Sequence, residues 1–380
     1  MGVRKKTAVI GLGHQALEDH LPGLAGSRFA QLVAVCDTDP SKAAAQAQRY
    51  EVAGFTDVRG LLEEVRSDFA VVAVPHHADR EVIGACAAAG VHVMKEKPFA
   101  TSPAEAAELV ALCGRAGIEL MVAVQRRFHP LYTAAVPLLE RIGRPYLVEG
   151  RYTFHCPDPA AGWRGRVALA GGGALMDMGY HLIDLLIWYL GLPDRVPADT
   201  SAAARPDAQY DAEDTALVHL AYDCGLYGSL LVSRSAGPKS EHLTVTGPHG
   251  TVVIERGRVR RPAPDGQLIE SLISEPAWPS AAATQIDSFC RVLDGERPNP
   301  SGPGTHSAHA AFLATSYASR TSLKMANHAA REAVGQWLPK RVLLNATSKL
   351  ARGLSHSFNS QSIIWTGAGT ISGGNMTDRD

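Results

Sequence analysis

The chain has 380 residues, of which 46% are hydrophobic and 20% are charged, as in an ordinary globular protein. Its 37 Lys and Arg residues are balanced by 38 Asp and Glu residues, so no basic excess points to nucleic acid or to an anionic membrane surface. This balance does not exclude an anionic substrate, because a local pocket does not show in the total charge. At roughly 100–200 residues per domain, the length predicts two domains.

The cysteines and the first residues predict the compartment. None of the six cysteines lie in a CxxC pattern, so we expect reduced, mostly buried thiols. The chain start runs directly into an apolar, strand-like segment, which predicts no signal peptide. No apolar stretch reaches the roughly 18 residues that cross a bilayer. The sequence therefore predicts a cytoplasmic protein with neither a membrane nor a nucleic acid as partner.

Residues 1–125 alternate short apolar runs with amphipathic stretches. The runs are rich in Val, Ile and Ala and show little polar alternation, as in strands buried on both faces. This order predicts an α/β domain with a doubly wound parallel sheet. The predicted strands are Thr7–Ile10, Leu32–Cys36, Phe69–Val74, Val91–Met94 and Leu120–Val124. The predicted helices are Pro40–Tyr50, Val58–Arg66, Arg80–Ala89 and Pro103–Ala116.

After about residue 145 the pattern changes to short strands with a period of two, broken by Gly and Pro. We assign residues 126–330 to an α+β domain with an open, mainly antiparallel sheet that serves substrate binding and oligomerisation. Residues 331–380 are assigned to a loosely ordered tail. The predicted strands are Leu147–Phe154, Ala216–Tyr222, Leu226–Ser233, His242–Val245 and Thr251–Glu255. The predicted helices are Gly173–Leu190, Ala281–Leu293 and Ser307–Lys324.

The segment Gly11-Leu12-Gly13-His14-Gln15-Ala16 directly follows the first predicted strand. Gly11 permits a tight turn, Gly13 lets a pyrophosphate approach the backbone, and Ala16 lets the next helix pack closely on the sheet. The start of that helix offers N–H donors to the phosphates. The pattern predicts a Rossmann dinucleotide site to which His14 and Gln15 also contribute.

Asp37 ends the second predicted strand, about 20 residues beyond Ala16, where a ribose-binding acid is expected. Its carboxylate would accept hydrogen bonds from the ribose 2′-hydroxyl and would repel a 2′-phosphate. No Arg follows immediately to hold such a phosphate. We therefore expect NAD as the cofactor, with NADP less favoured. In the alternative interpretation, the glycines only form a turn and Asp37 caps the next helix.

A second group of residues suits hydride transfer to or from an alcohol carbon. Lys97 follows a strand that ends beside the expected nicotinamide crevice. Asp177 and His181 lie four residues apart on one helix, which begins at a glycine triplet where backbone can approach a ligand. His181 is the natural base for the hydroxyl proton, since an unperturbed imidazole titrates near neutral pH. Asp177 could orient the imidazole or bind a substrate hydroxyl, and Lys97 could donate to the same oxygen.

Together these motifs resemble the glucose–fructose oxidoreductase/inositol dehydrogenase (Gfo/Idh/MocA) family over about residues 5–328. The resemblance implies an NAD(P)-dependent oxidoreductase acting on a sugar, a polyol or inositol, or a related cyclic alcohol or ketone. It also implies catalytic roles for Lys97, Asp177 and His181 and assembly into homodimers or homotetramers. The segments that carry it are Glu96-Lys97-Pro98, Gln125-Arg126-Arg127-Phe128, Gly171 to Asp184, Glu213-Asp214-Thr215 and Ser316-Tyr317-Ala318-Ser319.

One position departs from the family pattern. Many members carry a His four residues after the proline of the fourth strand, and here Asp79 follows Pro75 at that distance. This puts the local cofactor or loop contacts in question. We still expect Pro75, His76 and Glu96 to contact the cofactor. Lys95, two residues before Lys97, is expected to be solvated.

Five further residues carry two interpretations each. Tyr180 contacts substrate or merely packs, and Asp184 orients His181 or is a structural partner. Arg127 binds substrate or steadies the domain junction. Trp163 and Arg164 are expected on a loop and could wall a sugar pocket, since aromatic rings stack on sugar faces and Arg binds hydroxyls or acids.

Two other functions compete with the dehydrogenase. A catalytically inactive dinucleotide-binding regulator would not need Lys97, Asp177 and His181 together. An NAD-dependent glycosidase of the same fold is disfavoured because such relatives are often exported. No metal site is expected, since the histidines lack HxxxH and HExxH spacing.

Overall fold

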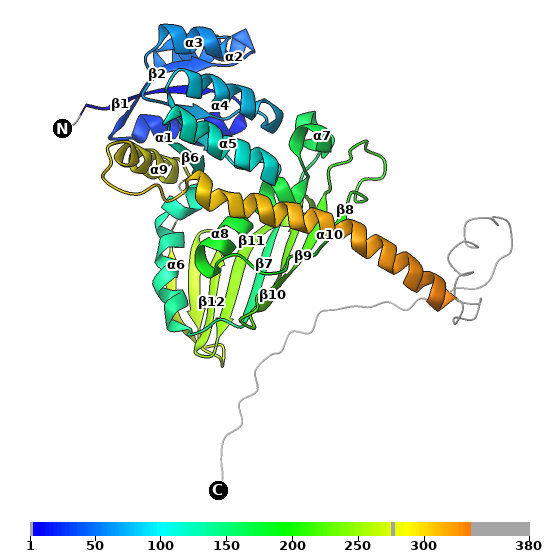
Figure 1. The fold of residues 1–380 in the computed structure, drawn as a ribbon. Helices are drawn as coiled ribbons and strands as arrows, with labels where there is room; N and C mark the ends of the chain where they lie inside the picture. Colours follow the sequence, from blue (N-terminus) through cyan, green and yellow to red (C-terminus); the bar gives the residue numbers. More distant parts are fainter. Residues whose placement is uncertain (1–2, 275–277, 336–380) are drawn as a thin grey trace, which may run out of the picture. The chain divides into compact units, whose positions relative to one another are not determined.

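A computed structural model describes residues 3–274 and 278–335 (Figure 1). Its contacts divide the chain into Met1–Met325 and Ala326–Asp380. The first unit holds two β-sheets. The described residues of the second unit are the end of helix α10 (Pro303–Gly335), which therefore includes the start of the segment assigned to a tail. The remainder of the predicted tail lies outside the described residues.

The first sheet is parallel throughout and has the strand order β3-β2-β1-β4-β5-β6. All five predicted strands are confirmed. The missed strand, β3, has only three residues, two of them exposed, and so offers no hydrophobic period. The strands are β1 (Lys5–Ile10), β2 (Ala30–Cys36), β3 (Ala53–Phe55), β4 (Phe69–Val72), β5 (His92–Glu96) and β6 (Leu120–Ala123).

The helices of this sheet begin where their capping residues stand. Asp39 accepts hydrogen bonds from the N–H groups of Ser41 and Lys42, and Ser102 accepts one from Glu105, so both satisfy donors that the first helical turn leaves free. The four predicted helices are confirmed. They are α2 (Pro40–Tyr50), α3 (Val58–Glu64), α4 (Asp79–Ala88) and α5 (Pro103–Ala116), and a π-turn, η1 (Ala16–His20), leads into α1 (Leu21–Gly26) before them.

One helix returns to the first sheet from far along the chain. Phe289 of α9 (Trp278–Leu293) packs edge-on against Phe69 of β4, with ring centroids 5.2 Å apart. Ile286 and Cys290 join the same buried cluster as Val9. A boundary at residue 125 therefore separates α9 from the sheet on which it packs.

The second sheet has eight strands in the order β14-β13-β12-β11-β7-β10-β9-β8. Every pair is antiparallel except β10 with β7, so the predicted open, mainly antiparallel sheet is confirmed. The strands are β7 (Leu147–His155), β8 (Ala198–Ser201), β9 (Thr215–Ala221), β10 (Tyr227–Ser233), β11 (Ser235–Gly247), β12 (Gly250–Glu255), β13 (Arg258–Pro262) and β14 (Leu268–Ile273).

Helices α6 (Pro130–Arg141) and α8 (Tyr180–Leu190) pack on this sheet, α6 against β12 and β13 and α8 against β7. Helix α6 was missed because Pro137 lies inside it, and an internal proline is a sequence signal for a helix end. Strands β8, β13 and β14 were missed as well. Strand β14 has no alternation to detect, since nearly all its residues are exposed.

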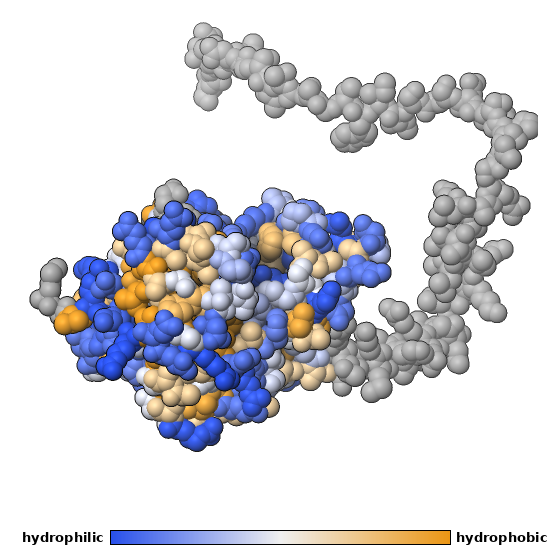
Figure 2. All heavy atoms as spheres, turned by 90° about the horizontal axis from the view of Figure 1, so that it is seen from above, coloured by the Kyte–Doolittle hydropathy of each residue, from blue (hydrophilic) through white to orange (hydrophobic). Residues whose placement is uncertain are grey.

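Hydrophilic residues (blue) cover much of the face drawn in Figure 2, and apolar residues (orange) form smaller patches between them. All six cysteines are free and four are buried, as expected for reduced thiols. In the described part of the chain, no helix combines the length and apolar character needed to cross a bilayer.

Candidate active site

A cleft of about 640 Å³ opens beside the carboxyl ends of β1, β2 and β4. Strand β1 lies between β2 and β4, so the connections leave it in opposite directions and open a crevice. Of the predicted cofactor residues only Ala16, which is buried, does not line the cleft. The others are Gly11, Gly13, His14, Gln15, Asp37, Pro75, His76, Glu96 and Lys97.

The glycine turn has the geometry that a bound pyrophosphate requires. Gly11 has φ +90°, and a Cβ there would lie 2.6 Å from the carbonyl oxygen of Ala73. Only glycine therefore fits this turn. A Cβ on Gly13 would meet no atom within 4 Å, so the space over its backbone is open. The residues present fit a dinucleotide.

Asp37 is fixed at the edge of the cleft by two backbone donors. Its Oδ2 accepts from the N–H of Leu12 at 2.7 Å, and its Oδ1 accepts from the N–H of Asp39 at 2.9 Å. Carboxylate oxygens accept more than one hydrogen bond, so capacity is left for a ribose hydroxyl. The alternative that Asp37 caps the next helix is wrong, since Asp39 does so. Lys42 and Arg59 also line the cleft. They were not identified from the sequence because neither follows Asp37 immediately.

Lys97 and Asp177 come together where this cleft meets the second half of the chain. The Lys97 Nζ donates to Asp177 Oδ1 at 2.6 Å and to the Asp177 carbonyl at 2.9 Å. Arg164 Nε lies 3.4 Å from Asp177 Oδ2. Burial raises the pKa of Asp177, but Lys97 and Arg164 outweigh it and hold the pKa below its ordinary range. The Asp177 side chain is 33% exposed, so this ionised carboxylate is accessible to solvent.

His181 follows Asp177 at the first turn of α8. Burial holds the pKa of its imidazole well below the ordinary value, and the nearby cations Arg126, Lys97 and Lys239 lower it further. The ring is therefore neutral in the folded protein, and the same shift makes it a weaker base than a free imidazole. Between the described residues the structure records no hydrogen bond from His181 to Asp177.

Trp163 and Arg164 lie on η4 (Gly162–Gly165) and line the cleft beside Lys97. The Trp163 ring meets the His76 ring edge-on at 4.5 Å, and the Arg164 guanidinium lies 4.5 Å over the Trp163 ring. This contact joins the cofactor wall to the side chains around Asp177. The expected placement of Trp163 and Arg164 as a pocket wall agrees with this geometry.

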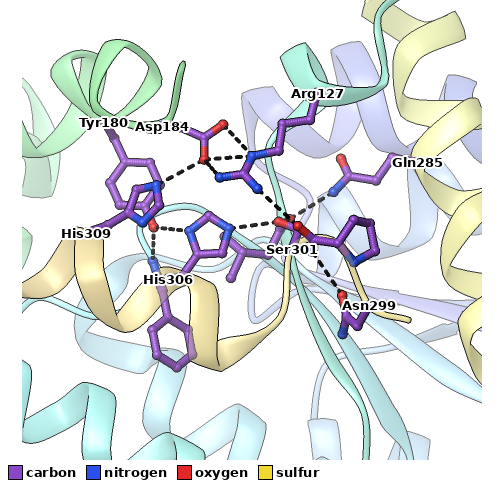
Figure 3. Close-up of polar contacts among 11 residues, drawn as sticks. Arg127, Tyr180, Asp184, Gln285, Asn299, Ser301, His306 and His309 are labelled. Atoms are coloured by element: carbon purple, nitrogen blue, oxygen red, sulfur yellow. Dashed lines mark hydrogen bonds and ion pairs between the residues drawn. The ribbon is translucent and has the colours of Figure 1, made fainter. Parts of the chain in front are cut away.

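Tyr180 does not face the substrate, because its side chain is fully buried. Its hydroxyl accepts from the N–H of Phe99 at 3.2 Å and lies 2.8 Å from His306 Nδ1 (Figure 3). The Ser301 hydroxyl donates to the Val122 carbonyl, so His306 Nε2–H donates to Ser301 and Tyr180 donates to Nδ1. Tyr180 thus ties the turn that carries Lys97 to the helix that carries His181.

Asp184 and Arg127 form a buried ion pair in the same network (Figure 3). Arg127 Nε and Nη2 both donate to Asp184, at 3.0 and 2.7 Å, and His309 Nε2 donates at 3.0 Å. Burial raises the pKa of Asp184, but Arg127 and His309 outweigh it and hold the pKa below its ordinary range. These contacts favour the interpretation of Arg127 as a junction residue, and among the described residues the structure records no hydrogen bond from Asp184 to His181.

Asp184, His306 and His309 also satisfy the distances of a metal cluster, since one ligand atom from each lies within 4.8 Å of the others. The Arg127 guanidinium already fills the place of a cation beside Asp184. His306 uses both ring nitrogens, toward Tyr180 and Ser301. Asp184 and His306 are thus satisfied by hydrogen bonds, whereas the buried Nδ1 of His309 has no hydrogen-bond partner among the described residues.

Lys95 is buried, not solvated as expected. Its Nζ donates to Asp79 Oδ2 at 2.6 Å and to the Pro98 carbonyl at 2.6 Å. Burial raises the pKa of Asp79 to about 7, and Lys95 opposes that rise. Asp79 occupies the position that departs from the family pattern. Through its buried ion pair with Lys95 it holds the turn that carries Lys97.

The glycine triplet packs against protein rather than offering backbone to a ligand. A Cβ on Gly173 would collide with the Glu213 backbone. The Glu213 carboxylate accepts from the N–H groups of Gly173 at 2.7 Å and Leu175 at 3.0 Å, and from the Tyr317 hydroxyl at 2.8 Å. Glu213 and Tyr317 were noted only as family landmarks, and they position the start of the helix that carries Asp177.

Two buried histidines make stability sensitive to acid. Burial lowers the pKa of His76 from 6.5 to about 3, and it lowers the pKa of His306 well below the ordinary value. Below about pH 6.5 the unfolded chain therefore binds more protons than the folded chain. The contribution of the two neutral rings to the free energy of unfolding is complete above that pH. It is lost as the pH falls, by at most about 2.7 kcal/mol per pH unit for the two rings together.

Urea unfolding at about pH 7 and about pH 5 measures this loss. We expect the free energy of unfolding to fall, and to fall less steeply in His76→Asn. His219→Asn, at an exposed site on β9, is the control and should keep the wild-type slope. Equal stability at both pH values would contradict the neutral state assigned to the buried rings.

Family models match both parts of the chain. The GFO/IDH/MocA oxidoreductase family with NAD-binding Rossmann fold matches residues 5–124. The GFO/IDH/MocA C-terminal domain matches residues 139–253.

Individual relatives agree with these matches. A putative UDP-kanosamine synthase oxidoreductase subunit of Amycolatopsis mediterranei is 33% identical over 60% of this chain and 68% of its own length. D-xylose 1-dehydrogenase (NADP(+)) 2 of Haloferax volcanii is 28% identical over 57% of this chain and 69% of its own. The alignments thus span about two thirds of each relative. The WlbA dehydrogenase of Bordetella pertussis, solved with NADH and UDP-GlcNAcA, superposes with a TM-score of 0.72 at 27% identity, covering 84% of this chain and 97% of that one.

Proposed function

This chain belongs to the Gfo/Idh/MocA family of NAD-binding oxidoreductases, and from that premise we propose that it transfers hydride between a nicotinamide dinucleotide and a sugar or polyol. One observation carries the proposal: Lys97 lines the dinucleotide cleft and donates to Asp177. Residues 1–125 would bind the dinucleotide, with α9 packed on their sheet, and the α+β part would bind the substrate. The dehydrogenase names of the relatives support a carbohydrate alcohol as the reacting group.

The proposed roles follow from charge and proton state. The dinucleotide, when bound, supplies the hydride acceptor or donor. Asp177 accepts a hydrogen bond from a neighbouring substrate hydroxyl and so orients the reacting carbon. Lys97 donates to the reacting oxygen and stabilises its alkoxide character. His181, neutral in the folded protein, takes the hydroxyl proton in oxidation and returns it in reduction. Trp163 offers a flat ring to the sugar face.

Purified protein supplied with NAD or NADP and a panel of sugars, inositols and sugar derivatives tests the proposal by absorbance of the reduced nicotinamide. Reduction of the dinucleotide with one substrate class is expected. Tight NADH binding without turnover in either direction would favour a regulatory protein. Net release of a glycan would identify a glycosidase.

Asp37 sets the preference for NAD in this proposal. We expect Asp37→Asn to raise the ratio of kcat/KM with NADP to that with NAD by about 10–100-fold, because one charge that repels a 2′-phosphate is removed while Lys42 and Arg59 remain in the same cleft. The matched control is Asp57→Asn, a carboxylate on the same cleft. An equal change in both variants would contradict a specific contact at Asp37.

We also propose that copies of the chain associate through the open face of the second sheet. Leu147 and Tyr227 on this sheet are 47% and 56% exposed, and large exposed apolar side chains on a sheet favour a covered face. A dimer or tetramer in light scattering is expected. A monomer at micromolar concentration would contradict this assembly.

A further inference from the structure

Cations outnumber carboxylates around the proposed reaction site. Asp177 is the acid at its centre, and it faces both Lys97 and Arg164. One negative charge therefore meets two positive charges at the edge of the cleft. The excess positive charge is accessible to solvent mainly at Arg164, whose side chain is 51% exposed, because the Lys97 side chain is only 12% exposed.

A second surplus lies near His181, at the other end of the same helical turn. Lys239 stands on β11 where its pairing with β7 shifts register. Its Nζ lies 6.0 Å from the Tyr152 ring centroid, and that ring lies 6.3 Å from the His181 ring. Among the side chains described in residues 3–274 and 278–319, no carboxylate lies within ion-pair distance of Lys239.

The acid on β11, Glu241, already forms an ion pair with another cation. Glu241 Oε1 accepts from Arg126 Nη2 at 2.7 Å, and both side chains are buried. Arg256 adds a further cation, with its guanidinium 5.4 Å over the Trp278 ring. Both Arg126 and Arg256 lower the pKa of Lys239, after burial, while Glu241 raises it. Lys239 is exposed and has no ion-pair partner recorded, so water is the main group that balances its charge, and an anionic ligand could take the place of that water.

We infer that the substrate carries an anionic oxygen group, a carboxylate or a phosphate, that Lys239 and Arg164 recognise beside the reacting carbinol. This rests on the proposed hydride transfer. A neutral sugar would leave the surplus charges unbalanced as it displaced water from them, whereas an anion accepts charge-assisted hydrogen bonds from both. The Arg164 guanidinium, lying over Trp163, offers the planar fork that suits such a group. Lys239 offers a point charge that suits either anion.

Matched pairs of substrates test this with the full chain and its dinucleotide: glucose against glucuronate and glucose 6-phosphate, and galactose against galacturonate. We expect the kcat/KM of an anionic member to exceed that of its neutral partner by about tenfold or more. Because Lys239 also influences the pKa of His181, the readout is the ratio of the two kcat/KM values within each variant: Lys239→Gln should remove most of that advantage, and Lys239→Arg should restore part of it. The control is Lys6→Gln, an exposed lysine on β1.

The outcomes separate this inference from the proposed function. Preference for glucuronate or for the phosphate identifies the anion. Equal or better turnover of neutral sugars, unaffected by Lys239→Gln, overturns the inference and leaves the dehydrogenase standing. If no member of any pair turns over, the proposed hydride transfer fails, and quenching of NADH fluorescence decides the inference. Sugar-acid binding that weakens in Lys239→Gln but not in Lys6→Gln supports it, and binding that is absent or equal in both variants overturns it.

Discussion

Replacing His181 by asparagine is expected to lower kcat by about 10²–10⁴-fold, the usual contribution of a positioned acid–base group. The neutral imidazole lies one turn from Asp177, and asparagine cannot take the hydroxyl proton. Lys97→Met is expected to have an effect of the same order, since Arg164 alone would then face Asp177. Steady-state kinetics with the preferred substrate measure both losses, and NADH fluorescence measures binding.

The two variants differ in a way that tests their roles. His181 does not line the dinucleotide cleft and Lys97 does, so NADH affinity should change by less than about threefold in His181→Asn. The matched control is His219→Asn, at an exposed histidine on the second sheet. If kcat in His181→Asn stayed within about threefold of wild type, the base would have to be sought elsewhere.

Replacing Arg127 by methionine is expected to lower the free energy of unfolding by about 3–5 kcal/mol, because Asp184 would keep a buried charge without its main partner. The side chains of Arg127 and Asp184 are 8% and 2% exposed, so water cannot replace the guanidinium. Nη1 of Arg127 also donates to the Pro300 carbonyl at 3.0 Å, which links α8 to the segment before α10. Chemical denaturation measures the loss.

This experiment also decides between the two interpretations of Arg127 that the sequence left open. A substrate ligand would raise KM at nearly unchanged stability, whereas a junction residue lowers stability first. Arg144→Met, an exposed arginine that donates to the Cys224 carbonyl, is the control and should change stability by less than about 0.5 kcal/mol. A raised KM in Arg127→Met at wild-type stability would return Arg127 to the substrate site.

The helix that carries the proposed catalytic groups shows where periodicity stops being a guide. Asp177 lies in the π-turn η5 (Leu175–Gly179) and His181 lies in the α-helix that follows. A π-turn adds a residue to the turn and rotates the faces that a strict helical count would align. Spacing predicted that Asp177 and His181 share a face, and it could not decide between the two interpretations of Asp184, whose recorded partners are Arg127 and His309.

The two lysines after β4 show a similar limit. Lys95 and Lys97 both lie at the carboxyl end of β5, and their spacing in the sequence gives no reason to expect different surroundings for them. Strand β5 ends at Glu96, so Lys97 leaves the alternation and reaches Asp177, while Lys95 stays inside and pairs with Asp79. The sequence does not reveal the carboxylate that pairs with a buried lysine when that carboxylate lies on another helix or strand.

The sequence by itself determined five of the six strands of the first sheet, the helices α2 to α5, the glycine turn and Asp37, because local signals specify them: apolar runs, capping residues and a short-range motif. Only the tertiary structure decided which charges meet. Arg127 with Asp184, Tyr180 with His306 and Lys239 with the surroundings of His181 join elements far apart in the chain. Such pairings depend on how the two sheets and α10 pack, and packing of distant segments leaves no period in the sequence.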